Sequence, residues 1–168
     1  MYAYGMNVQS DGKIVVGGEA TSAGLLARYA ADGSYDNSFG PLSGKNYLTS
    51  TLSGYDGVTF IETALRADDG IVTVGRFYSF NNWVPAVGIA VFDRDGHPVP
   101  LADASGVITA TAGTHVSSSY ALLVQLDGRV VVAGNADVDD TPSGRDTDLA
   151  LWRFFLGTQR IYLPVIMR

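Results

Sequence analysis

The chain contains no cysteine and is poor in lysine and glutamate. Without cysteine it can form neither disulfides nor thiolate metal sites, and the redox compartment stays open. Only Glu19 and Glu62 among its 17 acidic residues are glutamate, and only Lys13 and Lys45 are lysine. Aspartate bonds to nearby backbone and favours turns over helices. The chain therefore has little material for solvated helical faces, and we expect no substantial helix.

A basic cluster and a long apolar run are also missing. The net charge is −6 and the pI is about 4.6, which disfavours binding to nucleic acid or to anionic membrane surfaces. No apolar run approaches the ~20 residues of a membrane-spanning helix. Residues 1–5 show neither a basic nor an apolar leader pattern, so we expect no signal peptide in the chain as given. The chain could still be a mature fragment of an exported protein.

What the chain does contain is glycine, 20 residues of it, together with recurring valine, tyrosine and phenylalanine. Branched and aromatic side chains suit pleated sheets, and glycine supplies the positive φ angles of tight turns. This composition predicts strands connected by short turns.

Two landmarks recur at intervals of about 60 residues. The first is an Asp-Gly pair that precedes an apolar run closed by glycine, at residues 9–18, 66–75 and 125–134. The second is a short apolar segment that ends in an aromatic residue, at residues 26–29, 89–92 and 151–154. Two landmarks that keep one period indicate a repeat architecture such as a propeller.

Each repeat predicts the same order of strands. An alternating strand leads into the Asp-Gly pair, which favours a type I′ hairpin turn. The apolar run that follows predicts a central strand buried on both faces, and its closing glycine predicts a bulge or a close backbone approach. A third strand ends at the aromatic residue, and fourth strands are expected at residues 45–52 and 106–112. Residues 160–168 are either a fourth strand or a tail.

The predicted fold is all-β, a propeller-like array of three four-stranded antiparallel blades. Its repeats span about residues 1–55, 56–114 and 115–157, and residues 158–168 form the last strand or a C-terminal tail. Propellers typically have four to eight blades, so three should not close a ring. We therefore expect an open array that self-associates or continues in further blades of a longer chain. A closed pseudo-threefold β-trefoil is the alternative.

Residues 9–18, 26–29 and 32–40 together resemble the delta-60 repeat family. The resemblance implies tandem bacterial repeats of large secreted or surface proteins, which are thought to form propeller blades. The second copy departs from the pattern, because Asp69-Gly70 falls one residue late, and the third keeps only the first half. Residues 160–168 also resemble a short C-terminal segment of exported proteins from some environmental bacteria.

Candidate chemistry is sparse. The aspartates that precede glycine are interpreted as turn residues, and the two histidines, His97 and His115, occupy different parts of the repeat. The spacing of Glu19 and Glu62 indicates no carboxylate pair for glycoside hydrolysis. The densest acidic stretch could supply oxygens to calcium, although its spacing fits no EF-hand. This candidate calcium site comprises Asp137, Asp139, Asp140, Asp146 and Asp148; no other cofactor is indicated.

An aromatic segment is the most suggestive surface feature, because rings beside asparagine can stack on a sugar or anchor a protein. The candidate ligand-binding residues are Phe77, Tyr78, Phe80, Asn81 and Trp83. We expect a non-catalytic binding or scaffolding module of a secreted or surface bacterial protein, with a protein or a glycan as partner. The alternatives are a carbohydrate-binding module that uses residues 77–83, and a hydrolase fragment with aspartates at a propeller mouth.

Overall fold

The computed structural model describes residues 1–21, 23–41, 47–48, 56–78, 86–101, 107–110, 117–137, 147–156 and 161–167. These residues form three consecutive antiparallel sheets and no helix. No helix in these ranges is long and apolar enough to cross a membrane.

Each sheet is formed by a contiguous stretch of chain. The first sheet has the order β1(Tyr2–Val8)-β2(Ile14–Ala20)-β3(Ala23–Tyr29)-β4(Tyr47–Leu48). The second sheet has the order β5(Gly57–Leu65)-β6(Ile71–Tyr78)-β7(Ala86–Phe92)-β8(Val107–Ala110). The third sheet contains β9(Ser117–Val124), β10(Val130–Asp137), β11(Thr147–Phe154) and β12(Ile161–Met167) in the same sequential order. The segment that was expected to be a strand or a tail thus pairs with β11 as β12.

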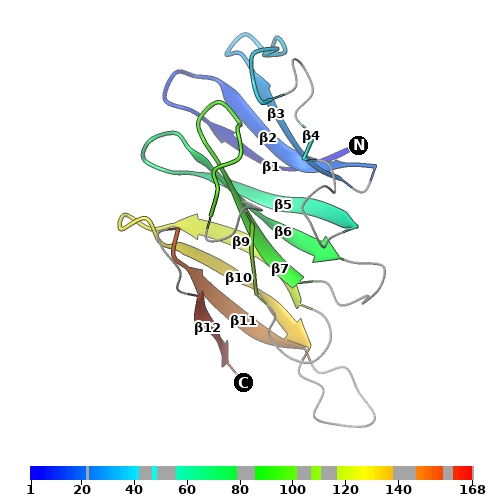
Figure 1. Ribbon diagram of the computed structural model, residues 1–168, viewed down its shortest axis with the longest axis vertical. Helices are drawn as coiled ribbons and strands as arrows, with labels where there is room; N and C mark the ends of the chain where they lie inside the picture. The colour runs from blue at the N-terminus through cyan, green and yellow to red at the C-terminus, as the bar shows by residue number, and fades with distance from the viewer. Residues whose placement is uncertain are drawn as a thin grey trace.

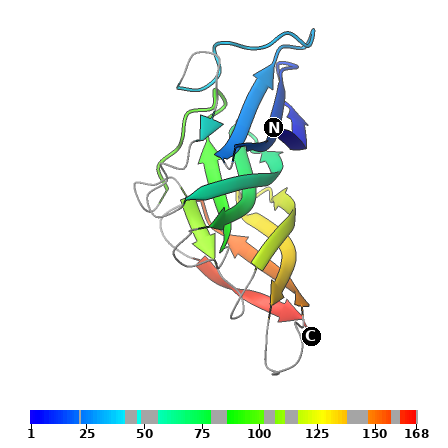
Figure 2. The same cartoon turned by 90° about the vertical axis from the view of Figure 1, so that its right-hand side faces the viewer.

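The three sheets stack face to face, with the second sheet between the other two (Figure 1). A view turned by 90° shows the same succession along the long axis (Figure 2). The sheets do not close on one another, which does not fit the closed β-trefoil alternative. The arrangement is consistent with an open, propeller-like array.

Two apolar cores lie between the sheets. The first interface, between the first and second sheets, contains Val15, Leu26 and Phe60. The second interface, between the second and third sheets, contains Val72, Ile89 and Trp152. Among the described sheets, only the second is covered on both faces: residues 71–75 of β6 are all buried, whereas β2 and β10 carry partly buried residues between the buried ones. The prediction of a central strand buried on both faces therefore holds in the second sheet alone.

The prediction of type I′ turns is wrong. That turn needs a positive φ at both central residues, but Asp11, Asp32 and Asp127 are not among the described residues with positive φ. In the first hairpin, Gly12 N–H donates to the Gln9 carbonyl and alone takes φ +84°. The loop is a type I turn closed by a left-handed residue. In the second sheet Asp69 takes that position at φ 62°, so the shifted Asp-Gly pair keeps the turn with a non-glycine residue.

The prediction for the closing glycines is confirmed. A Cβ built on Gly18, Gly75 or Gly134 would collide with a backbone carbonyl of the preceding strand. The register of the first two strands shifts beside this position in all three sheets. These glycines let the first strand of each sheet bulge against the second.

Candidate functional site

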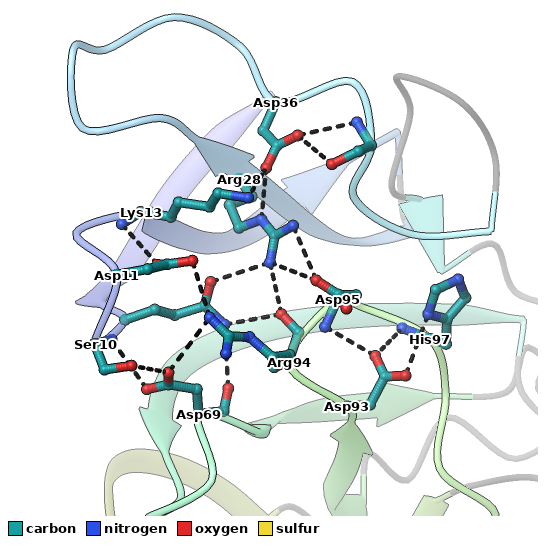
Figure 3. Close-up of polar contacts among 12 residues, drawn as sticks. Ser10, Asp11, Lys13, Arg28, Asp36, Asp69, Asp93, Arg94, Asp95 and His97 are labelled. Atoms are coloured by element: carbon teal, nitrogen blue, oxygen red, sulfur yellow. Dashed lines mark hydrogen bonds and ion pairs between the residues drawn. The ribbon is translucent and has the colours of Figure 1, made fainter.

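The largest polar cluster among the described residues surrounds Arg28, at the turn end of the first interface (Figure 3). Arg28 lies on β3 in register with Val15, on the face that packs against the second sheet. Its side chain is 1% exposed. A buried guanidinium is costly unless charges and acceptors compensate it, so its partners decide what the cluster can do.

Two carboxylates compensate the charge. Arg28 Nε donates to Asp36 Oδ2 at 2.9 Å, within the first sheet's own connection. Its Nη1 and Nη2 both donate to Asp95 Oδ1 at 3.1 Å, in the turn that follows β7 of the second sheet. The arginine therefore binds a carboxylate of each sheet.

Neutral groups complete the shell. Arg28 Nη1 also donates to the Arg94 carbonyl at 2.7 Å and to Gln9 Oε1 at 3.2 Å. The guanidinium carbon lies 4.7 Å from the centroid of the buried Phe39 ring. The side-chain amide of Gln9 reaches the carbonyls of Asp69 and Arg94 across the interface. These contacts fix the turn ends of the two sheets against each other.

An exposed rim surrounds this buried centre. The Ser10 hydroxyl and amide both donate to the Asp69 carboxylate. Arg94 Nη2 lies 2.9 Å from Asp11 Oδ2, and both side chains are partly exposed. Such exposed pairs typically contribute ~1 kcal/mol or less, so we regard Arg28 as the centre of the cluster. We call the whole set the Arg28 network; it comprises Gln9, Ser10, Asp11, Lys13, Arg28, Asp36, Asp69, Arg94 and Asp95.

Hydrogen bonds lower the pKa of two carboxylates of the network. The Ser38 hydroxyl and amide hold the pKa of Asp36 well below its usual range, and Lys13 and Arg28 add to the effect. The hydroxyl and amide of Ser10 likewise lower the pKa of Asp69, with a smaller contribution from Arg94. Both groups are therefore anions at neutral pH.

The described part of the network offers no metal-binding set. Within the described ranges, no group of three or more histidine, aspartate or glutamate side chains is placed to bind a metal ion. His97 Nδ1 lies 3.2 Å from Asp93 Oδ2 at the edge of the cluster, and both side chains are about half exposed. Asp93 also accepts the amides of Asp95 and His97, as a turn-forming aspartate does. The arrangement is suited to binding one sheet to another.

The candidate aromatic site is divided by the structure. Phe77 is fully buried, and its ring centroid lies 6.5 Å from that of Phe60 within the first interface. Tyr78 ends β6 and is partly buried. Phe80, Asn81 and Trp83 lie outside the described residues. Phe77 is thus a core residue, and binding by residues 78–83 stays a prediction.

The candidate calcium residues are divided too. Asp137 ends β10 and is buried, and its Oδ1 has no hydrogen-bond partner in the described part of the chain. Asp148 pairs in register with Ala136 on the neighbouring strand. Since side chains alternate between the faces of a sheet, Asp137 and Asp148 point to opposite faces. Asp139, Asp140 and Asp146 lie outside the described residues.

Sequence reasoning missed the Arg28 network. The available signal was a charged residue inside an apolar strand: Leu25, Leu26, Ala27 and Arg28 are all buried. A buried arginine needs a partner, and Asp36 follows eight residues later. Its second partner, Asp95, belongs to another sheet, and a sequence pattern alone does not bring the two together.

One family comparison bears on this region. Residues 9–39 match the family described as Domain of unknown function (DUF5122) beta-propeller. The matched segment includes Gln9, Arg28, Asp36 and Phe39, which are the first sheet's contribution to the buried centre of the network. No curated protein matches the chain. The match supports a β-propeller type of repeat and names no activity.

Proposed function

We propose that the chain is a non-catalytic repeat module that acts as a scaffold, with its three sheets as three blades of a propeller-like array. In this proposal each blade is a four-stranded copy of one delta-60-type repeat. The resemblance and the family match over residues 9–39 support the repeat type. By the same resemblance the module belongs to a secreted or surface protein of a bacterium, and it needs no cofactor.

The carrying observation is that successive sheets dock through equivalent positions. In the first sheet a cross-strand row of three residues faces the second sheet, and in the second sheet the row at the same place faces the third. The two rows are Asn7–Val15–Arg28 and Ala64–Val72–Val91. Their central valines are both fully buried in an interface core. A contact that is repeated between neighbours is the defining property of a repeat array.

The chemistry of the network supports a structural role. Arg28 donates to both Asp36 and Asp95, and its Nη1 also donates to Gln9 Oε1 and to the Arg94 carbonyl. A general acid or base needs a group free to exchange a proton with a substrate. The Arg28 network uses its charged groups for cohesion between sheets.

The proposal is tested by assaying Arg28→Met and Asp95→Asn for both stability and activity. The scaffold role predicts that both variants unfold at lower urea concentration than the unaltered chain. It also predicts no hydrolysis of chromogenic glycosides or esters above buffer by any of the three proteins. Hydrolysis by the unaltered chain that Asp95→Asn abolishes without loss of fold would overturn the proposal in favour of a hydrolase.

A further inference from the structure

The stack leaves one face of the first sheet and one face of the third sheet uncovered. On the first sheet, Met6 is 68% exposed and Val8 is 61% exposed, beside the partly exposed Ile14 and Val16. Their counterparts inside the stack are buried: Ile71 and Val130, which correspond to Ile14, are both at 0%. We call this surface the N-face; it comprises Met6, Val8, Ile14, Val16 and Tyr29.

The uncovered surface of the third sheet is also apolar, with Leu123 61% exposed and Leu149 52% exposed. The row Leu123–Val131–Arg153 crosses β9, β10 and β11 there. A second row, Ala121–Ala133–Leu151, lies beside it. We call this surface the C-face; it comprises Ala121, Leu123, Val131, Ala133, Leu149, Leu151 and Arg153.

The C-face corresponds to the surface with which each sheet docks on the next. Its row Leu123–Val131–Arg153 occupies the place of Asn7–Val15–Arg28 in the first sheet and of Ala64–Val72–Val91 in the second. Val15 and Val72 are fully buried by the following sheet, whereas Val131 is only partly buried. The C-face therefore has the form of a docking surface that none of the three described sheets covers.

The N-face corresponds to the surface that receives a docking sheet. Its row Val8–Ile14–Tyr29 matches one row in the second sheet and one in the third, each of which lies in an interface core. The matching rows are Leu65–Ile71–Phe92 and Val124–Val130–Phe154. The two uncovered faces are thus the two halves of the interface that occurs twice within the chain.

The polar groups of the first interface recur on these faces. Arg153 stands at the position of Arg28 but is exposed, and Gln125 stands at the position of Gln9. Gln9 Oε1 accepts from Arg28, whereas Gln125 Oε1 is buried and has no partner in the described part of the chain. The C-face therefore presents an exposed cation at the place where the network forms, and the buried Gln125 Oε1 occupies the position of Gln9 Oε1 without a described partner.

The complementary anion lies beside the N-face. The turn at Asp32-Gly33 has the same backbone hydrogen bonds as the turn at Asp95-Gly96, with Gly33 and Gly96 both at φ +84°. Asp32 thus stands where Asp95, the acceptor for Arg28, stands in the second sheet. The Ser34 hydroxyl and amide lower the pKa of Asp32, which keeps its carboxylate ionised at neutral pH.

We propose that the C-face of one copy of this chain docks on the N-face of a second copy, with Arg153 binding Asp32 of that copy as Arg28 binds Asp95. The reciprocal contact closes a ring of two copies and six sheets, a number within the usual range for propellers. Head-to-tail docking follows from charge, because pairing two C-faces gathers arginines and pairing two N-faces gathers aspartates. The inference rests on the proposed repeat module.

Charge reversal tests the contact by multi-angle light scattering and sedimentation velocity. The unaltered chain is expected at twice its mass of 17.8 kDa. Arg153→Asp and Asp32→Arg are each expected to raise the dimer dissociation constant by at least about thirtyfold, since each brings like charges together. Both residues are exposed, so the variants should keep the circular dichroism spectrum of the unaltered chain.

Mixing the two variants gives the sharper result. In a heterodimer of Arg153→Asp with Asp32→Arg, one contact has reversed charges and the other is native, so both attract. The mixture should regain the dimer mass that neither variant has alone. Asp68→Arg, a reversal at an exposed turn of the second sheet, is the matched control and should remain dimeric.

An unaltered chain that stays monomeric, or that forms an open-ended polymer, overturns the two-copy ring. Dimers that persist in both single variants, or a mixture that stays monomeric, overturn the Arg153–Asp32 contact. If the unaltered chain is a stable monomer and Arg28→Met still lowers its stability as expected, the repeat-module proposal is retained. The two proposals therefore fail separately.

Discussion

The two interfaces of the stack use equivalent positions, but the residues beside the central valine are polar at the first interface and apolar at the second. At the first interface the docking row carries Asn7 and Arg28, and Gly17 lies beside it, where an added Cβ would collide with the Thr63 side chain. At the second interface the same positions carry Ala64, Val91 and Val74, and the two valines belong to a core that includes Trp152. The first interface adds a close backbone approach and a polar network to its apolar core, whereas branched side chains fill the same positions of the second.

The comparison shows which features of the docking row the two interfaces share and which differ. The register of the row and the central valine are kept, so the backbone sets the docking geometry. The flanking side chains vary, because a buried ion pair and well-packed apolar residues are alternatives of similar stability in many proteins. The polar version also favours a particular neighbour, because Arg28 gains a carboxylate partner where the next sheet carries Asp95.

The largest effect is expected at the apolar interface, from Trp152→Ala. Trp152 is 1% exposed within the second core, and truncating a buried tryptophan costs about 3–5 kcal/mol. Urea unfolding followed by circular dichroism measures the loss. Leu126→Ala, at a fully exposed turn position, is the control and should change stability by less than about 0.5 kcal/mol. Equal losses of stability in Trp152→Ala and Leu126→Ala would contradict the burial of Trp152 in the second core.

Arg28→Met should have the next largest effect and probes the polar interface. Removing one partner of a buried ion pair costs about 3–5 kcal/mol, and we expect the lower end because Asp95 is half exposed. Arg94→Met makes the same chemical change at a partly exposed pair and should cost ~1 kcal/mol or less.

The salt dependence of stability should further distinguish the contributions of Arg28 and Arg94. Added sodium chloride should reduce the small effect of Arg94→Met and leave that of Arg28→Met nearly unchanged, since buried charges are weakly screened. Unfolding midpoints across a salt series provide the measurement. A strong salt dependence of the Arg28→Met effect would show that the pair is accessible to solvent.

Gly17→Ala tests the close approach of the first interface, with an intermediate effect. The new methyl meets Thr63 Cγ2, and overpacking of this kind costs about 1–3 kcal/mol. Thr63→Ser removes that methyl group and keeps the hydroxyl that accepts from Asn7. The double variant should therefore be more stable than the sum of the two single effects predicts. Strictly additive effects of the two substitutions would mean that contact with the Thr63 methyl group is not the cause of the stability loss in Gly17→Ala.

Much of the fold could be predicted from the repeat period. Hydrophobic pattern and turn residues located the strands, because both act within a few residues of chain. The turn type was mispredicted, because Asp-Gly fits both a type I′ turn and a type I turn followed by glycine in the left-handed region. The backbone of Asp69 distinguishes them: one aspartate can take the single left-handed position.

The Arg28 network could not be predicted from local sequence patterns, for a different reason. Arg28 and Asp95 lie on separate sheets, and their contact depends on how one blade docks on the next. The aromatic segment shows the converse error, since Phe77 resembles a loop residue in sequence yet continues β6 into the core. Packing between residues far apart in the sequence determines both the Arg28–Asp95 contact and the burial of Phe77.

The smallest expected effect is an acid sensitivity confined to the first interface. The pKa of Asp36 is lowered in the folded state, so its stabilisation is complete above its unfolded pKa of about 3.9 and is lost as the pH falls below that value. Asp36→Asn should therefore be less stable than the unaltered chain at pH 7, and the difference should shrink in acid. Hydrogen exchange should show β2 losing protection before β10, because Asp36 binds Arg28, which pairs with Val15 of β2. A difference that stays constant down to pH 3 would mean that Arg28 and Ser38 do not stabilise the Asp36 anion in the folded protein.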